Sequence, residues 1–302
     1  MTTPVAADTA IPSPPPGATR AVVAAVLVTM VAWASAFVAI RGVRYSFSPG
    51  ALALGRLAVG SLALTAAVLA RRAWVRPSGR EWALVCVCGV AWFAVYNVAL
   101  NAAEQRLDAG TAAMLISVGP ILIALLAGAL LGEGFPRWLL VGTGVAFTGA
   151  VLIAAASTRS SSADLVGVLL CLLAAATWAI GIMAQKPALR RLPALQVTQL
   201  ACTVGALACL PFAGQLVHDT HRASGAGIAG VIYLGLVPTA VAFGTWAYAL
   251  SRMDAGRLGV TTYLVSPLTI VVAWPVLGEA PAALALVGGL LALAGVALTR
   301  RR

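Results

Sequence analysis

The residues that could contact a small molecule lie inside long apolar stretches of this sequence. Polar and aromatic side chains recur there every three or four residues, a spacing that places them on one face of a helix. The candidates are Trp33, Ser35, Tyr96, Asn97, Asn101, Trp178, Gln185, Phe243, Trp246, Thr262, Tyr263 and Ser266. Polar groups that face lipid are costly, so these faces should turn inward. Together they predict a substrate cavity lined by amides, hydroxyls and aromatic rings, with little charge.

Each candidate also has a simpler explanation, which is hydrogen bonding between neighbouring helices. Such bonds contribute about 1 kcal/mol or less in membrane proteins. For any single residue, this role and contact with a substrate are equally well supported. The cavity is therefore predicted from the set of residues and not from one of them.

Arg56 is the one basic residue that lies well inside an apolar stretch. An unpaired arginine costs about 2.5 to 3.5 kcal/mol at the bilayer centre, so we expect it to pair with a carboxylate or with helix-end carbonyls, and the candidate carboxylates are Glu104 and Asp108. The pair would either hold two helices together, or form part of an outer gate or bind a substrate carboxylate. The second half of the sequence has no matching arginine, because the spacing aligns Leu200 with Arg56.

Three prolines interrupt apolar stretches that carry candidate residues, namely Pro120, Pro238 and Pro267. A proline inside a helix leaves a backbone carbonyl without its donor, which in a membrane is tolerated where protein or a water-filled cavity satisfies it. We expect these prolines to kink cavity-lining helices and to act as flexible points if the helices move. A plain helix kink is the alternative.

Enzymatic chemistry is not predicted. None of the nine acidic residues lies in the middle of an apolar stretch, so no set of acid, base or metal-binding groups converges at one depth. His218 and His221 have a spacing that could hold a metal, but a solvated loop is the better explanation for this polar stretch. The five cysteines fall in apolar segments and act as small apolar residues. We predict no catalytic residue, no metal and no cofactor.

The elements that must position these residues are transmembrane helices. At 61% hydrophobic and 10% charged residues, the chain is too apolar for soluble domains. Ten apolar runs of about spanning length follow a proline-rich start. They cover residues 21–40, 49–70, 81–103, 109–131, 138–156, 165–185, 193–214, 227–250, 256–278 and 282–299.

The two halves of the sequence repeat each other. Residues 108–133 and 254–279 both open with Asp-Ala-Gly, hold a central proline and close with Leu-Gly-Glu, and each predicts one spanning helix. Glycines seven residues apart should let two other helices approach closely, and they are Gly142 with Gly149 and Gly288 with Gly295. Five helices per repeat place the second copy upside down in the membrane.

The predicted fold is therefore an all-α integral membrane protein of ten transmembrane helices in two inverted five-helix repeats. A disordered proline-rich tail covers residues 1–19, and the repeats cover 20–156 and 165–299. With the N-terminus inside, fourteen basic residues lie on the cytoplasmic side and five outside. Both termini should be cytoplasmic, in the inner membrane of a bacterial cell.

The sequence resembles the ten-helix branch of the drug/metabolite transporter superfamily, which has two EamA-type domains. The resemblance rests on the segment from Trp33 to Phe37, on Pro49 with Arg56, and on the two repeated segments. Ala34 stands where the family usually has glycine. The resemblance implies two inverted repeats, a cavity lined by helices one, three, four, six, eight and nine, and export or exchange of small metabolites.

We therefore expect a secondary transporter that exports small neutral or zwitterionic, amino-acid-like metabolites by alternating access. Phosphorylated substrates are disfavoured because Arg56 is alone among basic residues inside a span. Efflux of amphipathic drugs, or a non-transporting membrane scaffold or enzyme, are the alternatives. The expected partners are the lipid bilayer and a small-molecule substrate, and a homodimer stays open. Nucleic acid is not expected, because the net charge of +11 comes from short gaps between apolar runs.

Overall fold

The computed structural model describes residues 16–43, 45–106, 115–157, 165–277, 283–299 and 301. Every regular element within these ranges is a helix. Residues 16–19, which we expected in the tail, already belong to the first helix. Asp108, Glu279 and the tail up to residue 15 lie outside the described residues.

The first half of the chain forms seven described elements. They are α1 (Pro16–Val43), α2 (Pro49–Arg71), α3 (Gly79–Cys88), the π-helical η1 (Gly89–Val95), α4 (Tyr96–Glu104), α6 (Gly119–Leu130) and α7 (Arg137–Ser157). Local sequence signals set several of their starts. Ser78 and Glu81 form a reciprocal capping box at the start of α3, and Pro49 occupies the first turn of α2, where its missing N–H costs nothing.

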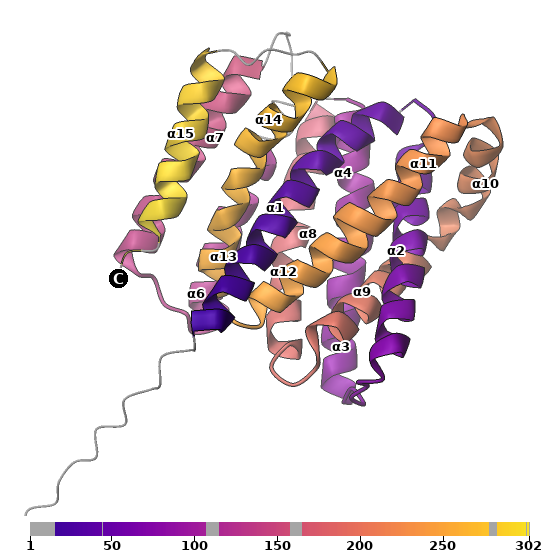
Figure 1. Ribbon diagram of the computed structural model, residues 1–302, viewed down its shortest axis with the longest axis horizontal. Helices are drawn as coiled ribbons and strands as arrows, with labels where there is room; N and C mark the ends of the chain where they lie inside the picture. Colours follow the sequence, from indigo (N-terminus) through magenta and orange to yellow (C-terminus); the bar gives the residue numbers. More distant parts are fainter. Residues whose placement is uncertain are drawn as a thin grey trace, which may run out of the picture.

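The second half continues the same kind of architecture. It contains α8 (Leu165–Ala188), α9 (Ala194–Ala208), the 3₁₀ turn η2 (Leu210–Phe212), α10 (Ala213–Arg222), α11 (Gly225–Leu234), the π-helical η3 (Gly235–Val241), α12 (Ala242–Leu250), α13 (Ala255–Thr261), the 3₁₀ turn η4 (Thr262–Leu264), α14 (Val265–Leu277) and α15 (Ala283–Leu298). Figure 1 shows α7 and α15 side by side at one end of the molecule, with α2 and α10 toward the other.

Five described helical stretches are long and apolar enough to cross a membrane. They are Arg20–Val43, Pro49–Arg71, Gly79–Glu104, Leu165–Ala188 and Gly225–Leu250, and a sixth forms if α9 and the segment from Leu210 to Arg222 count as one bent span. Their outward faces are apolar. Leu62 and Leu69, for example, are 73% and 70% exposed. An apolar surface of this kind matches lipid and not water, so the chain is a multi-pass membrane protein.

The stretch with the two histidines differs from the expected loop. Cys209 follows the last residue of α9, and η2 then leads into α10, which contains His218 and His221 and bends away from α9 by 51°. Pro211 explains the break, because proline disfavours a helical residue before it and removes a backbone donor. His218 contacts the carboxylate of Asp219 and is exposed.

The π-helical segments occupy the same place in both halves, since η3 begins and ends 146 residues after η1. Their first residues make equivalent crossings. A Cβ added at Gly89 would lie 2.7 Å from the carbonyl oxygen of Ala201, and one at Gly235 would lie 2.8 Å from that of Arg56. By this contact, Ala201 is the residue of the second half that corresponds to Arg56. The sequence spacing had instead aligned Leu200, one residue earlier, with Arg56.

The glycines seven residues apart do let two helices approach closely. A Cβ at Gly142 would lie 2.6 Å from the carbonyl oxygen of Gly295, and one at Gly149 would lie 2.5 Å from that of Gly288. The helices that carry them, α7 and α15, therefore pack backbone against backbone, as predicted.

Neither repeated Asp-Ala-Gly to Leu-Gly-Glu segment is one regular helix, contrary to our expectation. In the first, a turn at Ser117 and Val118 precedes α6, and Pro120 lies in the first turn of that helix. In the second, η4 separates α13 from α14, and Pro267 follows two residues after the start of α14. A proline is tolerated best in a first turn, so each helix restarts at its proline instead of bending around it.

Candidate functional site

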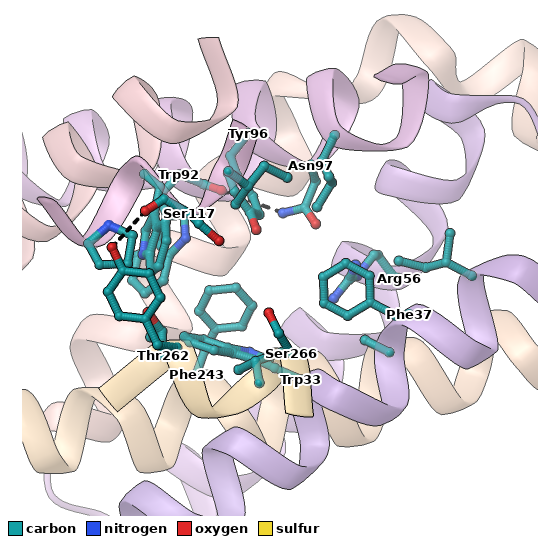
Figure 2. A pocket seen from close by; sticks show the side chains of 18 residues that line it. Trp33, Phe37, Arg56, Trp92, Tyr96, Asn97, Ser117, Phe243, Thr262 and Ser266 are labelled. Atoms are coloured by element: carbon teal, nitrogen blue, oxygen red, sulfur yellow. Dashed lines mark hydrogen bonds between the residues drawn. The ribbon is translucent and has the colours of Figure 1, made fainter. Parts of the chain in front are cut away.

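A cavity of about 100 Å³ lies between the two halves of the chain. It is lined by Trp33, Ala36, Phe37, Ile40, Arg56, Trp92, Tyr96, Asn97, Leu100, Ile116, Ser117, Pro120, Trp178, Phe243, Thr262, Tyr263, Val265 and Ser266. These residues come from the six helices that the resemblance implies, with α2 in addition. Figure 2 shows Arg56 beside Phe37 at one side of the cavity, and Trp92, Ser117 and Thr262 at the other.

Most of the residues predicted from the sequence reach this cavity. Those that line it are Trp33, Tyr96, Asn97, Trp178, Phe243, Thr262, Tyr263 and Ser266, together with Arg56 and Pro120. Those that do not are Ser35, Asn101, Gln185, Trp246, Glu104, Pro238 and Pro267. The helices that carry the predicted residues therefore surround this cavity, but helical spacing did not separate the residues that face it from those that lie elsewhere on the same helices.

Two of the residues outside the cavity connect helices, which is the simpler explanation that the sequence left open. The Ser35 hydroxyl donates to the carbonyl of Ala32 and accepts a 2.7 Å hydrogen bond from the Tyr233 hydroxyl, joining α1 to α11. The Asn101 amide donates to the carbonyl of Pro49 at 3.1 Å, joining α4 to α2.

The other two outlying candidates are buried in the helix core. Trp246 stacks against Trp33, with ring centroids 5.1 Å apart. Gln185 is fully buried on α8, and neither of its amide atoms has a hydrogen-bond partner among the described residues. Gln185 lies seven residues after Trp178, on the same helical face but farther along the helix than the cavity.

Trp92, which we did not single out, completes an aromatic wall. Its ring lies 4.8 Å from that of Phe243 and 6.2 Å from that of Trp33, and Trp33 lies 5.6 Å from Phe243. Aromatic pairs in these edge-on arrangements contribute about 0.5 to 1.5 kcal/mol each beyond the area they bury. The wall is therefore stiff, and it joins α1, η1 and α12.

Some of the missed lining residues carried a sequence signal. Trp92 lies four residues before Tyr96, so extending the polar and aromatic face by one turn would have found it. Phe37 and Ile40 likewise continue the face of Trp33 at helical spacing. Ile116 and Ser117 gave no such signal, because they reach the cavity through the turn before α6.

Arg56 is bound by a chain of contacts that starts at Pro238. Because Pro238 has no N–H, the carbonyl of Leu234 lacks the donor four residues on that an α-helix would give it. The hydroxyl of Thr239 donates to this carbonyl at 2.8 Å and accepts a 3.1 Å hydrogen bond from Arg56 Nε. Thr239 is fully buried, so the bond fixes Arg56 from the side away from the cavity.

The predicted ion pair between Arg56 and Glu104 does not form in the described part of the chain, and Asp108 lies outside it. Instead, η3 places the hydroxyl of Thr239 against α2, where it accepts a hydrogen bond from Arg56 Nε. Sequence spacing alone could not show that these two segments meet.

Asn97 binds backbone carbonyls through its side chain in the first half, as Thr239 does in the second. Its amide nitrogen donates to the carbonyl of Phe93 at 2.8 Å and to that of Trp92 at 3.5 Å, at the end of η1. The donor side of the amide is thus occupied, and its carbonyl oxygen has no partner among the described residues. Since Asn97 lines the cavity, it offers a ligand an acceptor.

The two broken helices meet at the cavity. The hydroxyl of Tyr263 on η4 donates to the carbonyl of Ser117 at 2.8 Å, and Thr262 donates to the carbonyl of Gly259 at 2.6 Å. These bonds satisfy backbone groups that the interruptions leave open. Pro120 borders the cavity, whereas Pro267 and Pro238 shape helices behind it.

Past the cavity, polar contacts connect the two halves. Glu133 accepts hydrogen bonds from the N–H groups of Ala255 at 2.7 Å and Gly256 at 3.0 Å, where a carboxylate is favoured by the start of α13. Lys186 donates to the carbonyl group of Leu250, the last residue of α12, and to that of Met253 just after it. The Leu-Gly-Glu end of the first repeated segment is thus bound to the Asp-Ala-Gly start of the second.

Comparison with known proteins agrees with this architecture. The EamA-like transporter family matches residues 20–155 and 165–301. A probable terminal-alkyne amino-acid exporter from Streptantibioticus cattleyicolor is 39% identical over 279 residues, covering 92% of this chain and 93% of its own. The uncharacterized transporter YdfC from Bacillus subtilis is 32% identical, and the match covers 88% of this chain and 87% of YdfC.

A crystal structure at 22% identity has a TM-score of 0.79 and covers 93% of this chain and 96% of its own, so the fold is shared. The family match extends over nearly all of the described helices. The family and the names of the relatives indicate a transporter rather than an enzyme. The chain therefore belongs to the EamA-like transporter family of the drug/metabolite transporter superfamily.

Proposed function

We propose that this protein exports small amino-acid-like metabolites, zwitterionic or neutral overall, across the inner membrane of a bacterial cell. The observation that carries the proposal is the cavity itself, in which one arginine faces a largely aromatic lining with a few neutral polar groups. The relative from Streptantibioticus cattleyicolor, named as a probable amino-acid exporter, supports the same substrate class.

The proposal includes ten transmembrane helices in two inverted repeats, with both termini in the cytoplasm. The matched positions of η1 and η3 support a repeated unit, and the excess of basic residues on one side supports the orientation. Reporter fusions after α1, α7 and α15 test the orientation. A C-terminus on the outside would contradict both the helix number and the inversion.

Transport would proceed by rocking of the two repeats. Pro120, Pro238 and Pro267 lie where lining helices are interrupted or widened, so they are the points at which we expect those helices to flex. Gln185 and Trp246 are buried on the faces that carry Trp178 and Phe243. We expect them to reach the substrate path when the halves rock.

Uptake into proteoliposomes tests the substrate class. Purified protein is supplied with labelled apolar amino acids, amines and cationic dyes, and empty liposomes serve as the control. We expect counterflow of apolar amino acids to exceed that of amines and dyes. The aromatic wall also suits efflux of amphipathic drugs, so dye transport without amino-acid transport would replace the proposal with that function. No transport of any compound would favour a scaffold.

A further inference from the structure

The cavity carries charge of one sign. Arg56 is the single charged residue among the described lining residues, and no carboxylate lies among them. It is only 4% exposed. Glu104 lies near enough to act on the charge of Arg56 but forms no ion pair with it among the described residues, so an anionic ligand could pair with the guanidinium directly.

The orientation of Arg56 leaves a particular geometry for that anion. Its Nε donates to Thr239, and its two terminal nitrogens have no hydrogen-bond partner among the described residues. These nitrogens form the end of a planar fork that matches a carboxylate with two parallel hydrogen bonds. Because Thr239 is itself bound to the carbonyl of Leu234, the fork is fixed before a ligand arrives.

The cavity offers fewer favourable contacts to an ammonium group than to a carboxylate. The neutral acceptors that line it include the carbonyl oxygen of Asn97 and the hydroxyl of Ser266. The aromatic rings can attract a cation through their faces, but they are packed edge against face with one another. A ligand with an ammonium group and no carboxylate would also meet the positive charge of Arg56.

We infer that the carboxylate is the recognised group of the substrate. It binds Arg56, an apolar tail lies against Trp33, Trp92 and Phe243, and the α-amino group adds little. Apolar amino acids and the corresponding monocarboxylates are both ligands, whereas amino-acid amides and amines are not. Thr239 is a positioning residue for this recognition. The inference rests on the proposed transport of amino-acid-like substrates and specifies which part of them is bound.

Three compounds with the same alkyl tail test this directly. Norvaline has both charged groups, pentanoate lacks the ammonium, and norvalinamide lacks the carboxylate. Binding to the purified full-length protein in nanodiscs is measured by tryptophan fluorescence and by thermal stabilisation. We expect norvaline and pentanoate to bind within about tenfold of each other and norvalinamide at least about thirtyfold more weakly, the loss expected for a charge-assisted bidentate pair.

Variants show whether Arg56 is responsible. Arg56→Gln should weaken norvaline and pentanoate by about thirtyfold and leave norvalinamide unchanged, whereas Arg56→Lys should retain part of the preference for the acids. Thr239→Val should reduce that preference, and Thr239→Ser should restore it because the hydroxyl remains. Arg252→Gln is the matched control, since Arg252 is exposed beside Tyr248 and lies outside the cavity.

Equal binding of norvaline and norvalinamide would overturn the inference, and so would an equal loss for all three compounds in Arg56→Gln. Failure of all three compounds to bind the wild type would overturn it as well. The proposed function fails separately. Carboxylate-selective binding without any transport in proteoliposomes would reject export but retain the carboxylate-binding site. Transport of amides as fast as acids would retain export but reject recognition through the carboxylate.

Discussion

The two π-helical segments, η1 and η3, share a backbone but not a chemistry. Each begins with a glycine that crosses a neighbouring helix, Gly89 against α9 and Gly235 against α2, at nearly the same distance from a carbonyl oxygen. A π-helical turn is rare and is frequently found at functional sites. Its presence at the same position in both halves therefore indicates that the crossing is what the repeated sequence preserves.

The side chains of the two segments have different tasks. Trp92 and Phe93 of η1 extend the aromatic wall, while Pro238 and Thr239 of η3 fix Arg56. Phe93 and Thr239 occupy equivalent places, and each packs near the glycine of the crossing helix, Gly205 or Gly60. The difference teaches that the shared backbone builds the cavity and that divergence of a few side chains makes one side apolar and the other cationic.

The largest expected effect is at the shared glycines. Gly89→Leu and Gly235→Leu each place a side chain where even a Cβ would lie within 3 Å of backbone oxygen, so both should cost at least about 4 kcal/mol and leave little folded protein. Membrane abundance and the unfolding midpoint measure this. Gly244→Ala is the control, because no atom lies within 4 Å of the added Cβ. If Gly89→Leu folds normally and Gly235→Leu does not, the two crossings are not equivalent.

Trp92→Ala should have the next largest effect. It removes a buried ring that contacts Trp33, Phe93, Phe243 and Trp246, and we expect a loss of about 3 kcal/mol in the free energy of unfolding. Binding of ligands with an apolar tail should weaken, whereas the preference for acids over amides should stay. Thermal unfolding and the ligand series measure the two effects. If the acid preference disappears, the two segments do not have separate tasks.

Glu133→Gln extends the comparison to the contact between the two repeats. The change keeps the shape but removes the charge that faces the start of α13, so we expect a loss of about 1 kcal/mol. A shift in the unfolding midpoint would measure it. Glu81→Gln serves as a matched control, because glutamine can also complete the capping box with Ser78 and the ion pair that is lost is with the exposed Arg191, so stability should change less. Equal shifts for both variants would remove any special role of the Glu133 contact.

Pro238→Ala should have the smallest effect. Since η1 has the same π-helical backbone without a proline, the crossing glycine and not the proline should maintain η3. The new N–H gives the Leu234 carbonyl a second donor, so Thr239 is held less firmly. We expect a change below about 1 kcal/mol and a loss of transport of about twofold to fivefold. Loss of the fold in this variant would show that proline, and not glycine, sets the geometry of η3.

The sequence by itself determined the class of the protein and the helices around its cavity. Composition and run length predict a membrane protein because lipid requires long apolar helices. Helical spacing then identifies the faces that carry Trp33, Tyr96, Asn97 and Phe243, since polar groups must turn away from lipid. The close approach of α7 and α15 could also be predicted from their glycines, because only small residues let helix backbones meet.

Tertiary structure decided which residue on each face reaches the cavity and which partner it meets. Ser35 and Asn101 lie on the predicted faces but bond to α11 and α2, and Arg56 bonds to Thr239 and not to Glu104. Such outcomes depend on where helices far apart in the sequence cross. The periodicity of one helix fixes a direction around its own axis, but it carries no information about the height at which another helix passes.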